Sequence, residues 1–283
     1  MPSSSPPAEK KHFASLPSLR QKSGGIYPTI LCLIQAGNKV TPGTKARDGH
    51  TIARVGERIY QDRREAGKAL ARTVLDAGLP DLKDAVVLGL VRGGVPVAFE
   101  VAMALGLPLD VMIVRKIGAP GNREFAMGAA ASGGAVVLNP EVVAGYGVSE
   151  ERLRNLIEEQ RTEIGRLEKL YREGRPPVEF GEGGVILVDD GLATGASMRA
   201  AVQAVRPRAR RVTVAVPVGA RSTCEELGKE VDHMVCPLMP DPLEAVSLFY
   251  REFGPTEDEE VRTLLTEARQ RSGVRDQRSE TRP

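Results

Sequence analysis

The fold is decided by residues 185–197, which read Val185-Ile186-Leu187-Val188-Asp189-Asp190-Gly191-Leu192-Ala193-Thr194-Gly195-Ala196-Ser197. Four aliphatic residues without polar alternation predict a strand that is covered on both faces, as in a parallel sheet. Two carboxylates and a loop of small residues follow, and the run from 196 to 205 predicts a helix that stops before Pro207. The stretch is therefore a strand–loop–helix unit with an acid pair at the carboxyl end of the strand.

The loop after this strand has the composition of an anion-binding site. Ligands of open α/β sheets bind beyond the carboxyl ends of the strands. Gly191 and Gly195 let the backbone approach a ligand, and the loop N–H groups with the helix N-terminus form an anion cradle. An acid pair beside such a cradle suits a ligand with both a phosphate and vicinal hydroxyls. Ribose 5-phosphate is such a ligand, with its phosphate in the loop and its hydroxyls donating to Asp189 and Asp190.

The same alternation continues on both sides of this unit. Apolar runs at 85–91, 109–114 and 212–216 predict further buried strands. Helical patterns cover residues 57–77, 95–105 and 221–229, residues 125–138 read as a hairpin, and residues 149–172 predict a long amphipathic helix capped by Ser149. The pattern predicts an α/β fold with an open, mainly parallel sheet flanked by helices and a small helical hood.

The stretch D-D-G-L-A-T-G-A-S at 189–197 resembles the motif with which type I phosphoribosyltransferases bind phosphoribosyl pyrophosphate (PRPP). It is most similar to the adenine-type form, D-D-L-L-A-T-G-G-T. Gly191 departs from that form, where an apolar residue is usual, and Ala193 stands where hypoxanthine–guanine enzymes have Asp. The resemblance extends over about residues 57–260. It implies that PRPP is bound by Asp189, Asp190, Gly191, Leu192, Ala193, Thr194, Gly195, Ala196 and Ser197.

Two further loops fall where this family has functional residues. Residues 92–94, Arg-Gly-Gly, follow a predicted strand and resemble the pyrophosphate loop. Residues 115–124 are similar at their start to the R-K-x-G-x-x-P-G run of adenine enzymes, which leads into a mobile lid, and Gly118, Pro120 and Gly121 suit a moving loop. The resemblance implies pyrophosphate binding by Arg92, Gly93, Gly94, Arg115 and Lys116. It implies catalytic roles for Glu124 as acid/base, and for Lys116, Arg123, Asp189 and Asp190.

The implied reaction transfers ribose 5-phosphate from PRPP to a nucleobase-like acceptor and releases pyrophosphate. Mg²⁺ is the implied cofactor, held mainly through substrate oxygens and water, with no direct protein ligand. The resemblance implies small-molecule substrates, and we expect a homodimer. The three unpaired-looking cysteines favour a reducing cytoplasm, the basic charge confined to the first 50 residues argues against a nucleic-acid partner, and no apolar run suits a membrane. The base pocket is expected in residues 140–180 and 237–260. The aromatic stretch 248–253 either stacks on a base or packs in the core through Phe249 and Phe253.

Two other readings of the acid pair stay open. A non-catalytic regulator that binds PRPP would keep residues 185–197 but would not need the charges at 115–124. A response-regulator receiver also has paired acids after a strand, but near the start of its domain, whereas at least two predicted strands precede this pair. The most informative test of these alternatives is a thermal-shift screen with PRPP and Mg²⁺ against a panel of bases.

Composition limits the remaining possibilities. The 283 residues include 39 Lys and Arg against 37 Asp and Glu, and 41% are hydrophobic, which excludes a disordered or collagenous chain. No apolar run approaches the roughly 18 residues that span a bilayer. Residues 1–50 carry seven basic and two acidic residues, so we expect residues 1–55 to be a disordered basic extension, 56–270 the domain, and 271–283 a disordered tail. The three Cys and three His match no metal or nucleophile pattern.

Overall fold

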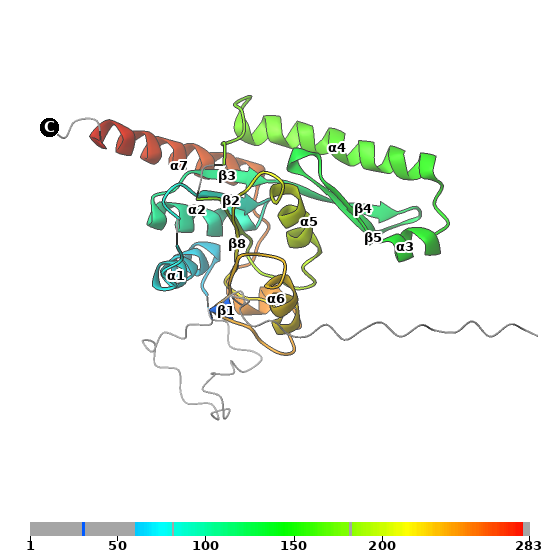
Figure 1. Ribbon diagram of the computed structural model, residues 1–283, viewed down its shortest axis with the longest axis horizontal. Helices are drawn as coiled ribbons and strands as arrows, with labels where there is room; N and C mark the ends of the chain where they lie inside the picture. Colours follow the sequence, from blue (N-terminus) through cyan, green and yellow to red (C-terminus); the bar gives the residue numbers. More distant parts are fainter. Residues whose placement is uncertain (1–29, 32–59, 81, 181–182, 280–283) are drawn as a thin grey trace, which may run out of the picture.

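The computed structural model describes residues 30–31, 60–80, 82–180 and 183–279, with only the backbone described at 30–31, 122–125 and 272–279 (Figure 1). Its main sheet has six strands in the order β1-β9-β8-β7-β2-β3, and every neighbouring pair is parallel. The strands are β1 (Ile30–Leu31), β2 (Val86–Leu90), β3 (Leu109–Met112), β7 (Val185–Val188), β8 (Val212–Ala215) and β9 (His233–Val235). The predicted α/β class with a mainly parallel sheet is confirmed.

Helices cover both faces of this sheet (Figure 1). The α-helices are α1 (Arg63–Asp76), α2 (Gly94–Leu105), α3 (Pro140–Gly145), α4 (Glu150–Arg172), α5 (Ala196–Val205), α6 (Arg221–Leu227) and α7 (Asp258–Ser279). Two short 3-10 turns are η1 (Ser132–Gly134) and η2 (Val246–Phe249). The predicted cap of the long helix is confirmed, because Ser149 Oγ accepts from the backbone N–H of Arg152 at 3.2 Å. None of the helices among these described residues is long and apolar enough to cross a membrane.

The strands are apolar throughout because each one is buried on both sides. In β7, Ile186 and Val188 belong to the core formed with α1, α2, α4 and α7, whereas Val185 and Leu187 belong to the core formed with α5 and α6. Successive side chains of a strand point to opposite faces, so a strand between two helical layers has no polar side. This double burial is why the period-two signal is missing from the sequence at 185–188.

The prediction that residues 115–124 form a loop is wrong, because most of them belong to a second, antiparallel sheet. Residues 115–124, expected to be a loop, lie mostly in β4 (Val114–Ala119) and β5 (Asn122–Ala131), which pair with each other, and β6 (Val136–Leu138) pairs with β5. In β4, Ile117 and Ala119 are buried while Arg115 and Lys116 are exposed. The strand was not predicted, because Gly118 and Pro120 interrupt its alternating pattern in the sequence. Figure 1 shows this hairpin with α3 and α4 extending to one side of the main sheet.

Three of the predicted segments can be compared with the structure. The expected N-terminal extension lies outside the described residues except for Ile30 and Leu31, which pair with Met234 and Val235 as an edge strand. Residues 237–260, expected to belong to the hood, contain η2 and the start of α7. They pack against α1, and Tyr250 pairs with Tyr60, which precedes this helix. The expected tail from 271 is helical as far as Ser279, because α7 continues through it.

Candidate active site

Three loops meet at the carboxyl edge of the main sheet. The last residues of the central strands are aligned, since Gly89 of β2 pairs with Val188 of β7, and Val188 pairs with Ala215 of β8. The segments that leave β2, β7 and β8 therefore start side by side. Asp189 and Asp190 follow β7 directly and stand in the middle of this edge.

The predicted pyrophosphate loop lies against the acid pair. A Cβ added to Gly93 would stand 2.2 Å from Oδ2 of Asp190, and one added to Gly94 would stand 2.6 Å from the carbonyl oxygen of Val188. Real Cβ atoms do not approach so closely, so a side chain at 94 would clash with backbone, and a side chain at 93 would displace the Asp190 carboxylate. The structure thus brings together two predicted loops that are about 95 residues apart in the chain.

Burial and mutual repulsion weaken the acidity of the pair. Burial, followed by the charge of Asp190, raises the pKa of Asp189 well above its usual range. Burial also raises the pKa of Asp190, and an ion pair with Arg63 opposes this shift. Asp189 Oδ1 accepts from the backbone N–H of Asp190 at 2.9 Å. Two adjacent, partly buried carboxylates are a costly arrangement that a ligand with hydroxyl donors would relieve.

The anion cradle has the predicted form. Gly195 has a φ of +76° and caps α5, and the first backbone N–H to bond within this helix is that of Arg199, which donates to the Gly195 carbonyl at 2.8 Å. The amides before Arg199 have no acceptor within the helix. Thr194 is exposed and Ser197 is partly exposed beside them. These groups can bind a phosphate at the N-terminus of α5.

Hydrogen bonds to the chain that follows β8 hold the loop between the acid pair and α5 in place. The N–H of Leu192 donates to the carbonyl of Val218 at 2.9 Å, and Thr223 Oγ1 donates to the carbonyl of Ala193 at 2.7 Å. Gly191, which departs from the family motif, is explained by its neighbour, because a Cβ there would stand 2.4 Å from a methyl carbon of Val246. The valine of η2 takes the space of the usual apolar side chain.

Arg92 of the predicted pyrophosphate loop is bound to Asp258, the first residue of α7. Its Nη1 donates to Oδ1 of Asp258 at 3.3 Å, and both side chains are about 44% exposed. The hydroxyl of Tyr171 donates to the same oxygen at 2.7 Å, and this bond lowers the pKa of Asp258. An exposed ion pair of this kind is weak, so Arg92 can turn toward an incoming anion.

The hairpin residues are the least constrained part of the predicted site. Arg115 and Lys116 are exposed, and Nε of Arg115 donates to Oε1 of Gln160 on α4 at 3.4 Å. The predicted roles of Arg123 and Glu124 depend on side chains outside the described part of the chain. Catalytic roles for these residues stay predictions.

The sequence analysis missed the residues that support the acid pair. Arg63 Nε donates to Oδ2 of Asp190 at 2.7 Å, and the hydroxyl of Tyr250 donates to the carbonyl of Asp190. Phe253 lies under the Arg63 guanidinium, 3.9 Å from Cζ to the ring centroid. Phe249 is in η2 and Phe253 is beyond it, so they do not share a helix face. The run of aromatic residues was the available signal, and of its two expected roles the structure shows core packing, since Phe249 is buried and Phe253 packs against the same cluster. The contact with Arg63 was not predicted.

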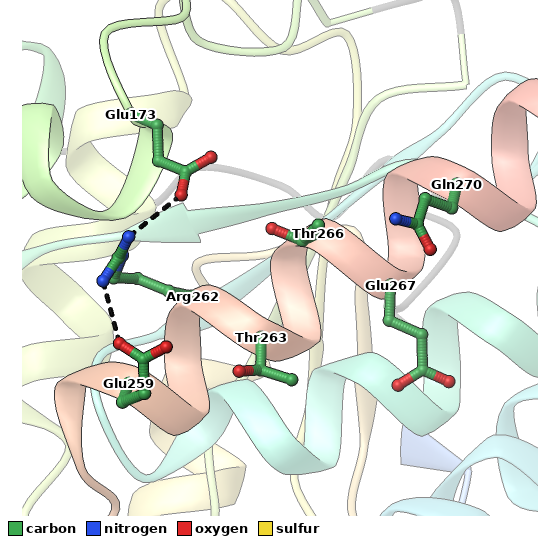
Figure 2. A pocket seen from close by; sticks show the side chains of 7 residues that line it. All are labelled: Glu173, Glu259, Arg262, Thr263, Thr266, Glu267 and Gln270. Carbon is green, nitrogen blue, oxygen red and sulfur yellow. Dashed lines mark hydrogen bonds and ion pairs between the residues drawn. The ribbon is translucent and has the colours of Figure 1, made fainter.

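A separate pocket of about 430 Å³ lies between the end of α4 and α7 (Figure 2). Arg262 lies between Glu173, at 3.2 Å, and Glu259, at 2.8 Å. Figure 2 shows Thr263 and Thr266 on the same helix as Arg262, which is α7. The pocket is lined by Glu173, Glu259, Arg262, Thr263, Thr266, Glu267 and Gln270. It includes no residue of the acid pair or of the two glycine loops, so it is distinct from the candidate site.

A magnesium ion carried by the substrate stays a prediction for the candidate site. Over residues 60–279, apart from the gaps in the described ranges, no three His, Cys, Asp or Glu side chains are grouped to hold a metal. One oxygen of Asp190 is bound to Arg63 and one of Asp189 to a backbone N–H. Mg²⁺ keeps several waters and binds through substrate phosphates in such sites.

The parallel sheet, the acid pair and the glycine cradle define this protein as one with the type I phosphoribosyltransferase fold. Comparison with known families agrees, since residues 56–246 match the family described as the phosphoribosyl transferase domain. The chain belongs to this family.

Two relatives are each similar to about three quarters of this chain. A protein of Mycobacterium tuberculosis that carries the provisional name phosphoribosyl transferase is 39% identical over 212 residues, which are 75% of this chain and 47% of that protein. This chain therefore spans about half the length of the curated relative. The crystal structure of the protein TT1426 from Thermus thermophilus is 43% identical, has a TM-score of 0.63, and matches 74% of this chain and 98% of that one.

Proposed function

We propose that this protein uses PRPP and Mg²⁺ to transfer a ribose 5-phosphate group to a nucleobase-like acceptor, with release of pyrophosphate. The observation that carries the proposal is the contact between the Gly93–Gly94 loop and the acid pair. In this proposal the Arg92–Gly94 loop binds the pyrophosphate group, the acid pair accepts two hydroxyls, and residues 193–197 bind the 5-phosphate. PRPP has these three groups on one sugar.

The residues have separate roles in this proposal. The cradle at residues 193–197 binds the 5-phosphate through its amides and hydroxyls. Asp189 and Asp190 accept the ribose hydroxyls, and their negative charge stabilises the positive charge that develops on the sugar ring. Arg92 leaves Asp258 and binds the pyrophosphate. Mg²⁺, when bound to the oxygens of PRPP, would neutralise part of the charge on the pyrophosphate.

The transfer is a displacement at the anomeric carbon of the sugar. The bond from this carbon to the pyrophosphate oxygen breaks, and its electron pair leaves with the pyrophosphate. A ring nitrogen of the acceptor forms the new bond, and the proton on that nitrogen passes to the Glu124 carboxylate, the predicted base. Lys116 of the hairpin stabilises the leaving negative charge.

Titration calorimetry with PRPP and Mg²⁺ tests the binding half of the proposal. Replacing a charged acceptor by a neutral one removes about 1.5–3 kcal/mol, so Asp190→Asn should weaken PRPP binding by roughly 10- to 150-fold. The matched control is Asp84→Asn, because Asp84 is an exposed carboxylate just before β2, at the opposite edge of the same sheet. The control should bind within about twofold of the parent.

A coupled pyrophosphate assay across purines, pyrimidines and orotate tests the transfer half. Pyrophosphate release with at least one acceptor, lost together with PRPP binding in Asp190→Asn, is the expected result. A parent protein that binds PRPP and releases no pyrophosphate with any acceptor would instead be a PRPP-binding regulator. A parent protein that does not bind PRPP contradicts the proposal altogether.

A further inference from the structure

Arg63 reaches the acid pair from a distant part of the chain. It is the first residue of α1, and its Nε donates to Oδ2 of Asp190 at 2.7 Å. Only 13% of the Arg63 side chain and 17% of the Asp190 side chain are exposed. The ion pair is therefore largely removed from solvent, where a charged hydrogen bond is stronger than at the surface.

The guanidinium of Arg63 is held on two further sides. Its Nη1 donates to the carbonyl of Gly254 at 2.7 Å, and its Cζ lies 3.9 Å from the centroid of the Phe253 ring. The Phe253 ring lies 4.9 Å from the Tyr250 ring, and the Tyr250 hydroxyl donates to the carbonyl of Asp190. One segment, residues 250–254, thus holds both Arg63 and the backbone of the acid that it binds.

These contacts leave one oxygen of Asp190 for a ligand. The Oδ2 side is closed by Arg63 and by Gly93, whose added Cβ would meet this oxygen at 2.2 Å and Arg63 Nε at 3.3 Å. Among the hydrogen bonds between described residues, none from another residue ends on Oδ1, which is therefore the candidate acceptor for a hydroxyl. The charged and titratable groups that face Asp190 are Arg63 from α1, Asp189 beside it and Tyr250 from the C-terminal segment. Arg63 is the cation among them.

We infer that Arg63 is a positioning residue of the PRPP site, which orients the Asp190 carboxylate so that Oδ1 accepts a ribose hydroxyl. The inference rests on the proposed function and extends it to a residue outside the binding motif. Arg63 acts through Asp190 and does not itself contact the ligand. A fixed acceptor needs less ordering when the ligand binds, so it binds the hydroxyl more tightly.

Arg64, the next residue of α1, provides a matched control. Its Nε forms an ion pair with Oε1 of Glu100 on α2, and its Cζ lies 4.6 Å from the centroid of the Phe99 ring. Arg64 therefore makes the same two kinds of contact as Arg63, from the same turn of the same helix. It differs in that its carboxylate partner is not one of the acid pair.

The experiment compares two ligands on Arg63→Gln, Arg63→Lys and Arg64→Gln. Ribose 5-phosphate uses the acid pair, whereas inorganic pyrophosphate uses the Arg92–Gly94 loop. In Arg63→Gln, calorimetry should show ribose 5-phosphate binding at least tenfold more weakly and pyrophosphate binding within about twofold of the parent. Arg63→Lys keeps the charge but loses the planar fork, so it should recover part of the affinity. Arg64→Gln should bind both ligands like the parent.

A double variant adds a readout that general loss of stability would not give. If Arg63 acts through Asp190, Arg63→Gln combined with Asp190→Asn should bind ribose 5-phosphate no more weakly than Asp190→Asn alone. Additive losses would overturn the inference, and so would equal losses of both ligands in Arg63→Gln or unchanged binding of ribose 5-phosphate. A parent that binds pyrophosphate and not ribose 5-phosphate would overturn the proposed function together with this inference.

Discussion

The two glycine loops at the edge of the main sheet and the β4–β5 hairpin differ in how their chemical groups are held. In the loops, Gly93 and Gly94 contact Asp190 and the end of β7 so closely that no side chain fits between them. In the hairpin, Arg115 and Lys116 are exposed on a strand that the sequence presents as a loop. The groups proposed to bind the ligand in its ground state are fixed by packing, whereas the cations expected to act on the leaving group lie exposed on a strand.

The strongest test of the fixed part is Gly94→Ala. The added methyl would overlap the carbonyl of Val188 at 2.6 Å, and such overpacking costs about 1–3 kcal/mol. We expect PRPP affinity to fall by about 100-fold and the melting temperature to fall by about 3–10 °C. Calorimetry and thermal unfolding measure the two effects.

Gly165→Ala is the control for that variant. Gly165 lies inside α4, and a Cβ there meets nothing within 4 Å. Alanine is favoured over glycine in a helix by about 1 kcal/mol, so this variant should be as stable as the parent or slightly more so. Binding retained in Gly94→Ala would mean that the contact between the loops is not needed for the ligand.

Lys116→Ala tests the adjustable part and should have a smaller effect. A cation that acts mainly on the departing pyrophosphate should change turnover by about tenfold, or 1.4 kcal/mol of barrier, and PRPP affinity by less. Steady-state kinetics and calorimetry on the same preparation separate the two. Lys68→Ala, which removes an exposed lysine from α1, is the control. A loss of affinity as large as the loss of turnover would remove the contrast between the two regions.

The smallest expected effect is on stability as a function of pH. Because the pKa of Asp189 is raised by burial and by the charge of Asp190, the folded protein binds a proton that the unfolded chain has lost. Its stability should therefore decrease as the pH rises through the raised pKa. Asp189→Asn cannot ionise, so it should melt higher than the parent at pH 7–8, with the advantage shrinking toward pH 4.

Asp232→Asn should have the opposite sign. Burial raises the pKa of Asp232, but the N–H of Val212 and the guanidinium of Arg206 outweigh it and lower the pKa overall. This carboxylate stabilises the fold above its ordinary pKa, and the contribution is lost as the pH falls. Asp232→Asn should therefore melt lower than the parent at neutral pH. Equal shifts in both variants, measured by thermal unfolding from pH 4 to 8, would contradict the assigned causes.

Local patterns predicted most of the fold and the centre of the site. The unit at 185–197 folds as a strand, a loop and a helix because each part has its own local cause: double burial, small residues and helical periodicity. The hairpin predicted at residues 125–138 is confirmed by the antiparallel pairing of β5 with β6. Strand β4 was predicted as a loop, because Gly118 and Pro120 interrupt the alternation of Ile117 and Ala119. Arg63 has no local signal, because a basic residue at the start of a helix is usually solvated.

The sequence by itself determined the α/β class, the acid pair at a strand end and the cradle after it, because these depend on neighbours within about ten residues. Only the tertiary structure decided what surrounds the acids. The contact of Gly93 with Asp190, the ion pair of Arg63 with Asp190 across 127 positions of the chain, and the hydroxyl of Tyr250 on its carbonyl all depend on the strand order. Crossover connections set that order through packing of the whole sheet, and no local pattern records it.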